Sequence, residues 1–179
     1  PRVASLKWAV PVGLSGGLMA LWWYLPFYGR SAFLNDMGWE KLGVELPQQL
    51  RIEPAGSSIR RADYVLLAVP SAHLADAIAG LTPAGLNRRA AIVSLSKGLV
   101  PPEGLPPTVI LAREFGERRV GCVGGPAHAQ EMVADGAALV CASTDEQLAT
   151  GLSSFFARAG VVCEPSSDPI GVEVAGAAK

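Results

Sequence analysis

From residue 61 onward, apolar runs alternate with segments whose apolar residues have helical spacing. The runs are residues 64–69, 90–95, 119–123, 137–142 and 161–164. Continuous apolar runs of this length are typical of strands that are covered on both faces of a sheet. The alternation predicts an α/β fold with a doubly wound, mostly parallel sheet.

Capping residues and helical spacing predict where the helices begin and end. The expected helices are 72–81, 108–115, 127–134, the one opened by a capping box at 144–147, and one from 169 onward. Ser71 is expected to cap the first of them, and Asp168 the last, with Pro169 at its first position. Gly160 is expected to end the helix that the capping box opens.

Residues 1–60 are less regular. Lys7–Val12 and Leu21–Phe27 have the composition of strands, but too few residues separate them for a parallel crossover of about ten residues or more. Either the strands lie elsewhere or this unit is incomplete. Trp8–Gly29 also carries no charged side chain, which is the pattern of a membrane span, although Pro11 and Pro26 argue against a span.

Composition excludes several classes of function. Half of the residues are hydrophobic and the formal net charge is −1, so the chain has no basic field for nucleic acid. Cys122, Cys141 and Cys163 are expected to be buried free thiols in a reducing, cytoplasmic compartment. Their spacing, together with that of the two histidines, contains no metal-ligand pattern, so no metal site is expected.

Three strand ends carry candidate chemistry. Pro70 follows the first of the regular strands, Lys97 the second and Gly125 the third, and in a parallel sheet all three would lie at one edge. The stretch Val120–Met132 is typical of a strand, a glycine turn and a helix start that favours an anion. The alternative is a connection that only packs, and Lys97 would then be an ordinary solvated lysine.

Other polar residues allow two interpretations each. Lys179 follows a helix of small residues, where it could be desolvated and act as an acid or base, or it could be a frayed terminal residue. His128 at a helix start is more typical of a capped or packed histidine than of a catalyst. Glu131 and Glu173 could orient neighbours or lie on exposed faces.

Four motifs carry a family resemblance. They are YVLLAVPS at 64–71, VSLSKGL at 93–99, GGPAHAQE at 124–131 and GVEVAGAAK at 171–179. In this order and at these separations they resemble the bacterial NAD(P)-dependent glycerol-3-phosphate dehydrogenases. The resemblance implies a Rossmann-like cofactor domain over 1–179. It also implies NAD or NADP as cofactor, and interconversion of sn-glycerol 3-phosphate and dihydroxyacetone phosphate for glycerophospholipid precursor synthesis.

The resemblance also implies residue roles. Lys179 would accept the proton of the C2 hydroxyl, and Lys97 would contact both substrate and cofactor. Gly125 and Ala127 would line the substrate loop, although the family commonly has serine at the latter position. The implied cofactor contacts are Gly13, Leu14, Ser15, Gly16, Arg30, Pro70, Lys97 and Ala129.

The family pattern is incomplete at both ends of the chain. Pro11 fills the place of the first glycine of the nucleotide turn. The helical C-terminal domain of the family would start near Lys179, so we expect residues 1–179 alone to be inactive and the full-length protein to form a homodimer. The alternatives are a non-catalytic remnant of a nucleotide-binding fold, a protein anchored in a membrane by residues 8–29, and a dehydrogenase acting on another substrate.

Overall fold

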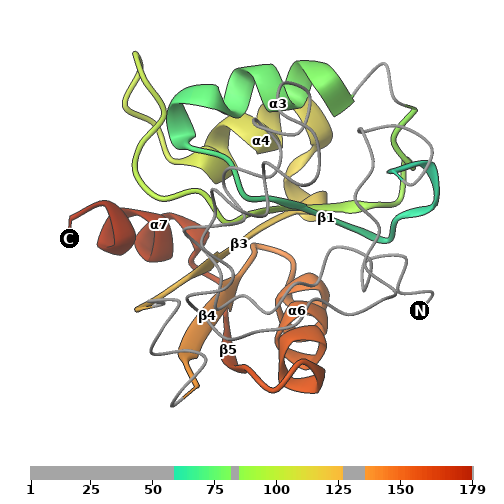
Figure 1. Ribbon diagram of the computed structural model, residues 1–179, viewed down its shortest axis with the longest axis vertical. Coiled ribbons are helices and arrows are strands. Elements are labelled where there is room, and N and C mark those ends of the chain that lie inside the picture. Colours follow the sequence, from blue (N-terminus) through green and yellow to red (C-terminus); the bar gives the residue numbers. More distant parts are fainter. Residues whose placement is uncertain (1–58, 82–84, 127–135, 179) are drawn as a thin grey trace, which may run out of the picture.

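A five-stranded sheet forms the centre of the computed structural model, which describes residues 59–81, 85–126 and 136–178 (Figure 1). The strands lie in the order β1-β2-β3-β4-β5. Their bounds are β1 Tyr64–Leu67, β2 Ala91–Ser94, β3 Val120–Gly124, β4 Ala138–Ala142 and β5 Val162–Ser166. All five apolar runs therefore form strands, each within a few residues of its predicted bounds.

Strand direction changes once across the sheet. β1, β2 and β3 are parallel, β3 and β4 are antiparallel, and β4 and β5 are parallel again. The doubly wound, mostly parallel sheet is thus confirmed, with one antiparallel pair inside it. The carboxyl ends of β4 and β5 therefore lie at the opposite end of the sheet from the carboxyl ends of β1, β2 and β3.

Four α-helices and three short 3-10 turns accompany the described strands. The helices are α3 Leu74–Leu81, α4 Pro107–Phe115, α6 Glu146–Arg158 and α7 Pro169–Ala177. The turns are η3 Ile59–Arg61, η4 Ser71–His73 and η5 Glu117–Arg119. The prediction that Ser71 caps a helix from 72 is wrong, because this serine opens η4 and α3 begins at Leu74.

Two apolar clusters fill the space on either side of the sheet. Figure 1 shows α3 and α4 on one side and α6 on the other. Ile92 packs into the cluster that includes Leu74 and Leu111, whereas the adjacent Val93 packs into the cluster of Leu152 and Phe156. Successive strand residues point to opposite faces, so a strand covered on both sides needs apolar residues at every position.

Asp145 is the N-cap of α6. Its carboxylate accepts a hydrogen bond from the Leu148 N–H at 3.0 Å, so the cap lies one residue after Thr144, the first residue of the predicted capping box. Gly160 follows the end of α6 with φ of 81°, as predicted for a helix-ending glycine. Asp168 caps α7 as predicted, since its Oδ1 accepts from the Gly171 N–H at 2.8 Å.

Two of the three cysteines form a disulfide. Cys141 on β4 and Cys163 on β5 are bonded, with Cα atoms 6.1 Å apart, whereas Cys122 is free and buried. The expectation of three free thiols is therefore wrong for two of them. Both side chains point into the same cluster from neighbouring strands, at a separation that suits a disulfide.

The expectations for the N-terminal part lie outside the described residues. They concern the strands Lys7–Val12 and Leu21–Phe27 and the uncharged stretch Trp8–Gly29. The helix expected at 127–134 also lies outside them. Among the helices of the described residues, none combines the length and the apolar composition that a bilayer crossing requires.

Candidate functional site

The carboxyl ends of the parallel strands meet at one edge of the sheet. Leu67 of β1, Ser94 of β2 and Cys122 of β3 lie in one row across the three strands. Pro70, Lys97 and Gly125 each lie three residues beyond this row. The structure therefore brings these three predicted site residues to the same edge, where ligands of open α/β sheets bind. We call this edge the strand-end site.

The loops after β1 and β2 are joined to one another. The Ser96 hydroxyl, which is buried, donates to the Val69 carbonyl at 2.7 Å. Gly98 has φ of 89°, and a Cβ atom there would lie 3.6 Å from the Ser71 hydroxyl oxygen. Lys97, between these two fixed residues, is exposed to solvent. The second loop therefore presents a cation on a backbone that is tied to the first loop.

The third loop depends on two glycines. Gly125 has φ of 132°, and a Cβ atom there would lie 3.2 Å from the Ala138 carbonyl oxygen. A Cβ atom on Gly124 would lie only 2.5 Å from Cγ1 of Val172. Any larger residue would clash or be strained here, so the glycines allow β4 and α7 to approach the end of β3 closely.

Helix α7 runs along β3 toward the strand-end site. The Cys122 thiol is 3.6 Å from the Pro169 carbonyl oxygen at the start of α7, and Val172 lies against Gly124 at the end of β3. Lys179 follows the end of α7 and lies just outside the described residues. The structure thus places the helix that leads to this lysine, but not the lysine itself.

Glu173 of α7 is buried, so the interpretation that it lies on an exposed face is wrong. Its carboxylate accepts from the Thr108 N–H at 3.1 and 3.2 Å and from the Thr108 hydroxyl at 2.6 Å. Thr108 lies in the first turn of α4, whose N-cap is Pro106 and has no side-chain cap of its own. Glu173 therefore caps a helix other than its own. The sequence holds only an indirect sign of this contact, because α4 has a proline, Pro106, at its N-cap and therefore needs a capping side chain from elsewhere.

Burial changes the acidity of two groups beside β3. Burial raises the pKa of Glu173 above its usual 4.5, and hydrogen bonds from Thr108 and Ser94 partly offset that rise. Burial, and then the charge of Glu173, raise the pKa of the Cys122 thiol well above 9.0. Since a protonated thiol is a poor nucleophile, Cys122 fits a packing role rather than a chemical one.

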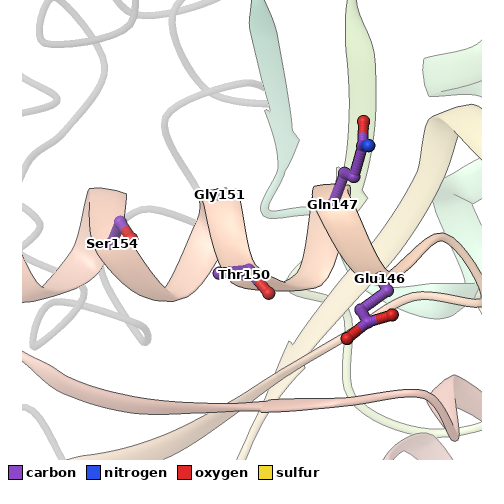
Figure 2. A pocket seen from close by; sticks show the side chains of 5 residues that line it. All are labelled: Glu146, Gln147, Thr150, Gly151 and Ser154. Atoms are coloured by element: carbon purple, nitrogen blue, oxygen red, sulfur yellow. The ribbon is translucent and has the colours of Figure 1, made fainter.

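A surface pocket lies away from the strand-end site. Figure 2 shows it on α6, with a volume of about 440 Å³ and a lining of Glu146, Gln147, Thr150, Gly151 and Ser154. All five residues belong to one helix, so the pocket includes none of the predicted site residues. Within the described part of the chain, no group of three or more His, Cys, Asp or Glu side chains could hold a metal ion.

The remaining predicted site residues are not placed. Those outside the described residues are Gly13, Leu14, Ser15, Gly16, Arg30, Ala127, His128, Ala129, Glu131 and Lys179. The described part of the strand-end site suits a phosphorylated ligand, because Lys97 and Gly125 are both exposed there. The helix starts of α4 and α7 are already capped by Glu173 and Asp168.

The sheet, with helices on both faces and glycine- and lysine-bearing loops at its carboxyl edge, defines a Rossmann-like α/β protein. The chain belongs to the NAD-dependent glycerol-3-phosphate dehydrogenase family. The family model for the N-terminus of NAD-dependent glycerol-3-phosphate dehydrogenase matches residues 41–149. This match confirms the family to which the four sequence motifs pointed.

Relatives in other organisms agree with this assignment. A glycerol-3-phosphate dehydrogenase [NAD(P)+] of Sinorhizobium fredii is 35% identical over 140 residues, which cover 76% of this chain and 41% of that protein. One of Deinococcus radiodurans is 31% identical over 175 residues, 96% of this chain and 51% of that protein. The chain thus spans about two fifths to one half of the length of these relatives.

Solved structures share the fold. The crystal structure of a glycerol-3-phosphate dehydrogenase from Coxiella burnetii matches with a TM-score of 0.66 at 24% identity. The match covers 73% of this chain and 40% of that one. At this identity the comparison supports the Rossmann-like architecture, which was also the sequence prediction.

Proposed function

We propose that the protein interconverts sn-glycerol 3-phosphate and dihydroxyacetone phosphate, with NAD or NADP as the redox cofactor. Membership of the dehydrogenase family supports this reaction, as do relatives named glycerol-3-phosphate dehydrogenase [NAD(P)+]. The observation that carries the proposal is the shared edge of Pro70, Lys97 and Gly125, three residues beyond one row of the sheet. The product would feed glycerophospholipid precursor synthesis in the cytoplasm.

The residue roles follow from the chemistry of an alcohol oxidation. NAD or NADP would supply the hydride acceptor for C2 of glycerol 3-phosphate, so the proton of the C2 hydroxyl must go to a base. Lys179, in its neutral form, is the proposed proton acceptor, because α7 leads to the strand-end site. In the reverse direction the same amine, protonated, returns that proton to the oxygen.

Lys97 is proposed to stabilise negative charge on the substrate. Its ammonium group is exposed on a loop that Ser96 ties to Val69, so it can reach a phosphate or a polarised C2 oxygen. Gly125 and Ala127 are proposed to line the substrate. Cofactor contacts are proposed at Gly13, Leu14, Ser15, Gly16, Arg30, Pro70, Lys97 and Ala129.

The test is oxidation of NADH and NADPH that depends on dihydroxyacetone phosphate, measured with a full-length protein that contains this chain. We expect turnover, and we expect Lys97→Met to lower kcat/KM by at least about 100-fold, since oriented charge contributes on that scale. The matched control is Arg118→Met, because Arg118 is exposed in η5 before β3, at the opposite edge. Turnover unaffected by Lys97→Met would overturn the role of this lysine.

A non-catalytic nucleotide-binding remnant is the second candidate, because Pro11 stands where the nucleotide turn of the family has its first glycine. Titration of the full-length protein with NADH, followed by energy transfer from tryptophan, separates the two candidates. Binding without any substrate-dependent oxidation would favour the remnant, whereas binding with oxidation supports the enzyme.

A further inference from the structure

Among the described residues, Glu173 is the one buried acidic side chain, with 7% of its surface exposed. Burying a carboxylate costs free energy unless hydrogen bonds compensate for lost water. Thr108 supplies two donors, its N–H and its hydroxyl, and the nearby Ser94 hydroxyl also acts to lower the pKa of this carboxyl. A serine or aspartate at position 106 could have capped α4 locally, so capping alone does not require a buried carboxylate from a distant segment.

The three segments that meet at Glu173 are the ones that lead to the proposed lysines. Ser94 ends β2 and lies three residues before Lys97. Glu173 lies on α7, six residues before Lys179. Thr108 opens α4, 65 residues away in sequence from the glutamate that caps it. The carboxylate thus bonds the body of α7 to the start of α4 and lies beside the end of β2.

Glu173 is also the last buried residue of α7. Pro169 is buried and Val172 half-buried, whereas residues 174–178 are all exposed. Within the part of the chain that the structure describes, Glu173 is therefore the last residue whose buried contacts fix the rotation of α7. A small rotation of α7 about its own axis would therefore displace any group that follows Glu173.

We propose that Glu173 is a positioning residue for the dehydrogenase reaction, holding the segment that bears Lys97 and the helix that leads to Lys179 in one fixed arrangement. This inference rests on the proposed function and adds to it a residue that need not touch substrate or cofactor. It assigns the buried carboxylate to the alignment of the two lysines rather than to proton transfer.

The test is a double-mutant cycle in the full-length protein, with Glu173→Gln and Lys179→Ala alone and together. Glutamine keeps one acceptor oxygen for Thr108 but loses the second, so the fold should survive while the alignment loosens. We expect Glu173→Gln to lower kcat at least about 10-fold, with KM for dihydroxyacetone phosphate changed less than about 3-fold. In the Lys179→Ala background, the same substitution should change the residual rate less than about 2-fold, because coupled residues are not additive.

Each outcome decides between roles. Equal losses of rate in both backgrounds would show a general structural role and overturn the positioning role. No loss in either background would overturn it as well. If the wild-type protein oxidises neither NADH nor NADPH with dihydroxyacetone phosphate, the proposed function itself fails first, and that result is distinct from an additive cycle in an active enzyme.

Two further variants guard against misfolding of Glu173→Gln. Ser94→Ala removes the hydroxyl that lies beside the carboxylate and also accepts from the Ser96 N–H at 3.3 Å, and it leaves the α4 cap intact. We expect it to lower kcat about 3- to 10-fold only when Lys179 is present. Glu114→Gln, an exposed glutamate on α4, is the matched control and should leave kcat, KM and the melting temperature unchanged. A Ser94→Ala variant with wild-type kcat would count against the proposal.

Discussion

Val172 occupies the space that a side chain at position 124 would need: a Cβ atom on Gly124 would lie 2.5 Å from Cγ1 of Val172 and 3.4 Å from its carbonyl oxygen. The absence of a side chain at Gly124 therefore determines how closely α7 approaches the sheet. Because α7 also carries Glu173, this contact and the Thr108 hydrogen bonds act on the same helix.

Gly124→Ala is expected to destabilise the protein by about 1–3 kcal/mol, because the added methyl group overpacks the contact between β3 and α7. The measurement is the free energy of unfolding in urea. Gly176→Ala is the matched control on α7, since a Cβ atom there would meet nothing within 4 Å. That control should be neutral or stabilising by about 0.5–1 kcal/mol, and equal destabilisation by both variants would contradict the packing argument.

Ser96→Ala is expected to cost about 1–3 kcal/mol, because it leaves the buried Val69 carbonyl without the hydroxyl that donates to it at 2.7 Å. The loop that bears Lys97 should also exchange its amide hydrogens faster, which mass spectrometry can follow. Ser154→Ala, at an exposed position of α6, is the control and should change neither quantity. Unchanged exchange in Ser96→Ala would show that other contacts hold the loop.

Thiol counting tests the disulfide between Cys141 and Cys163. The oxidised, unfolded chain should contain one reactive thiol, that of Cys122, whereas reduction should raise the count to three. Cys141→Ser with Cys163→Ser is expected to cost about 3 kcal/mol by the loop-entropy argument, for a sequence separation of 22 residues. Three reactive thiols before reduction would restore the expectation drawn from the sequence.

The buried carboxylate predicts a pH dependence of stability. The pKa of Glu173 is raised in the folded state, so the unfolded chain loses this proton at lower pH than the folded chain. Its contribution to folding is therefore fully present below its usual pKa of 4.5 and is lost as pH rises through the higher folded value. Urea unfolding at a series of pH values should show wild type losing stability relative to Glu173→Gln over this window. The opposite slope would mean that hydrogen bonds to the carboxylate outweigh its burial.

The sequence predicted the described strands well because burial on both faces demands continuous apolar runs, as in residues 64–69 and 90–95. It did not predict the direction of β4, since the apolar run 137–142 is compatible with either direction. The cap of α6 was misplaced by one residue because Thr144 and Asp145 can both accept a backbone hydrogen bond.

The candidate site was predicted in part. Pro70, Lys97 and Gly125 could be located because each follows a strand end, and parallel strands bring such ends together. The burial of Glu173 could not, because it depends on Thr108, which is 65 residues away. The disulfide could not be predicted for a similar reason, because the sequence of two apolar strands does not show that Cys141 and Cys163 lie on neighbouring strands.

The length of helix α7 determines where the chain that follows it begins. The helix starts beside Cys122 and passes Gly124, so the number of residues from Pro169 to Ala177 sets how far the helix extends along β3. One residue inserted after Val174 would move the end of α7 by about 1.5 Å along the axis and turn it by about 100°. An insertion in the exposed segment 101–104 would be absorbed locally. Evolutionary change in length at the strand-end site should therefore be tolerated in that loop and avoided in α7.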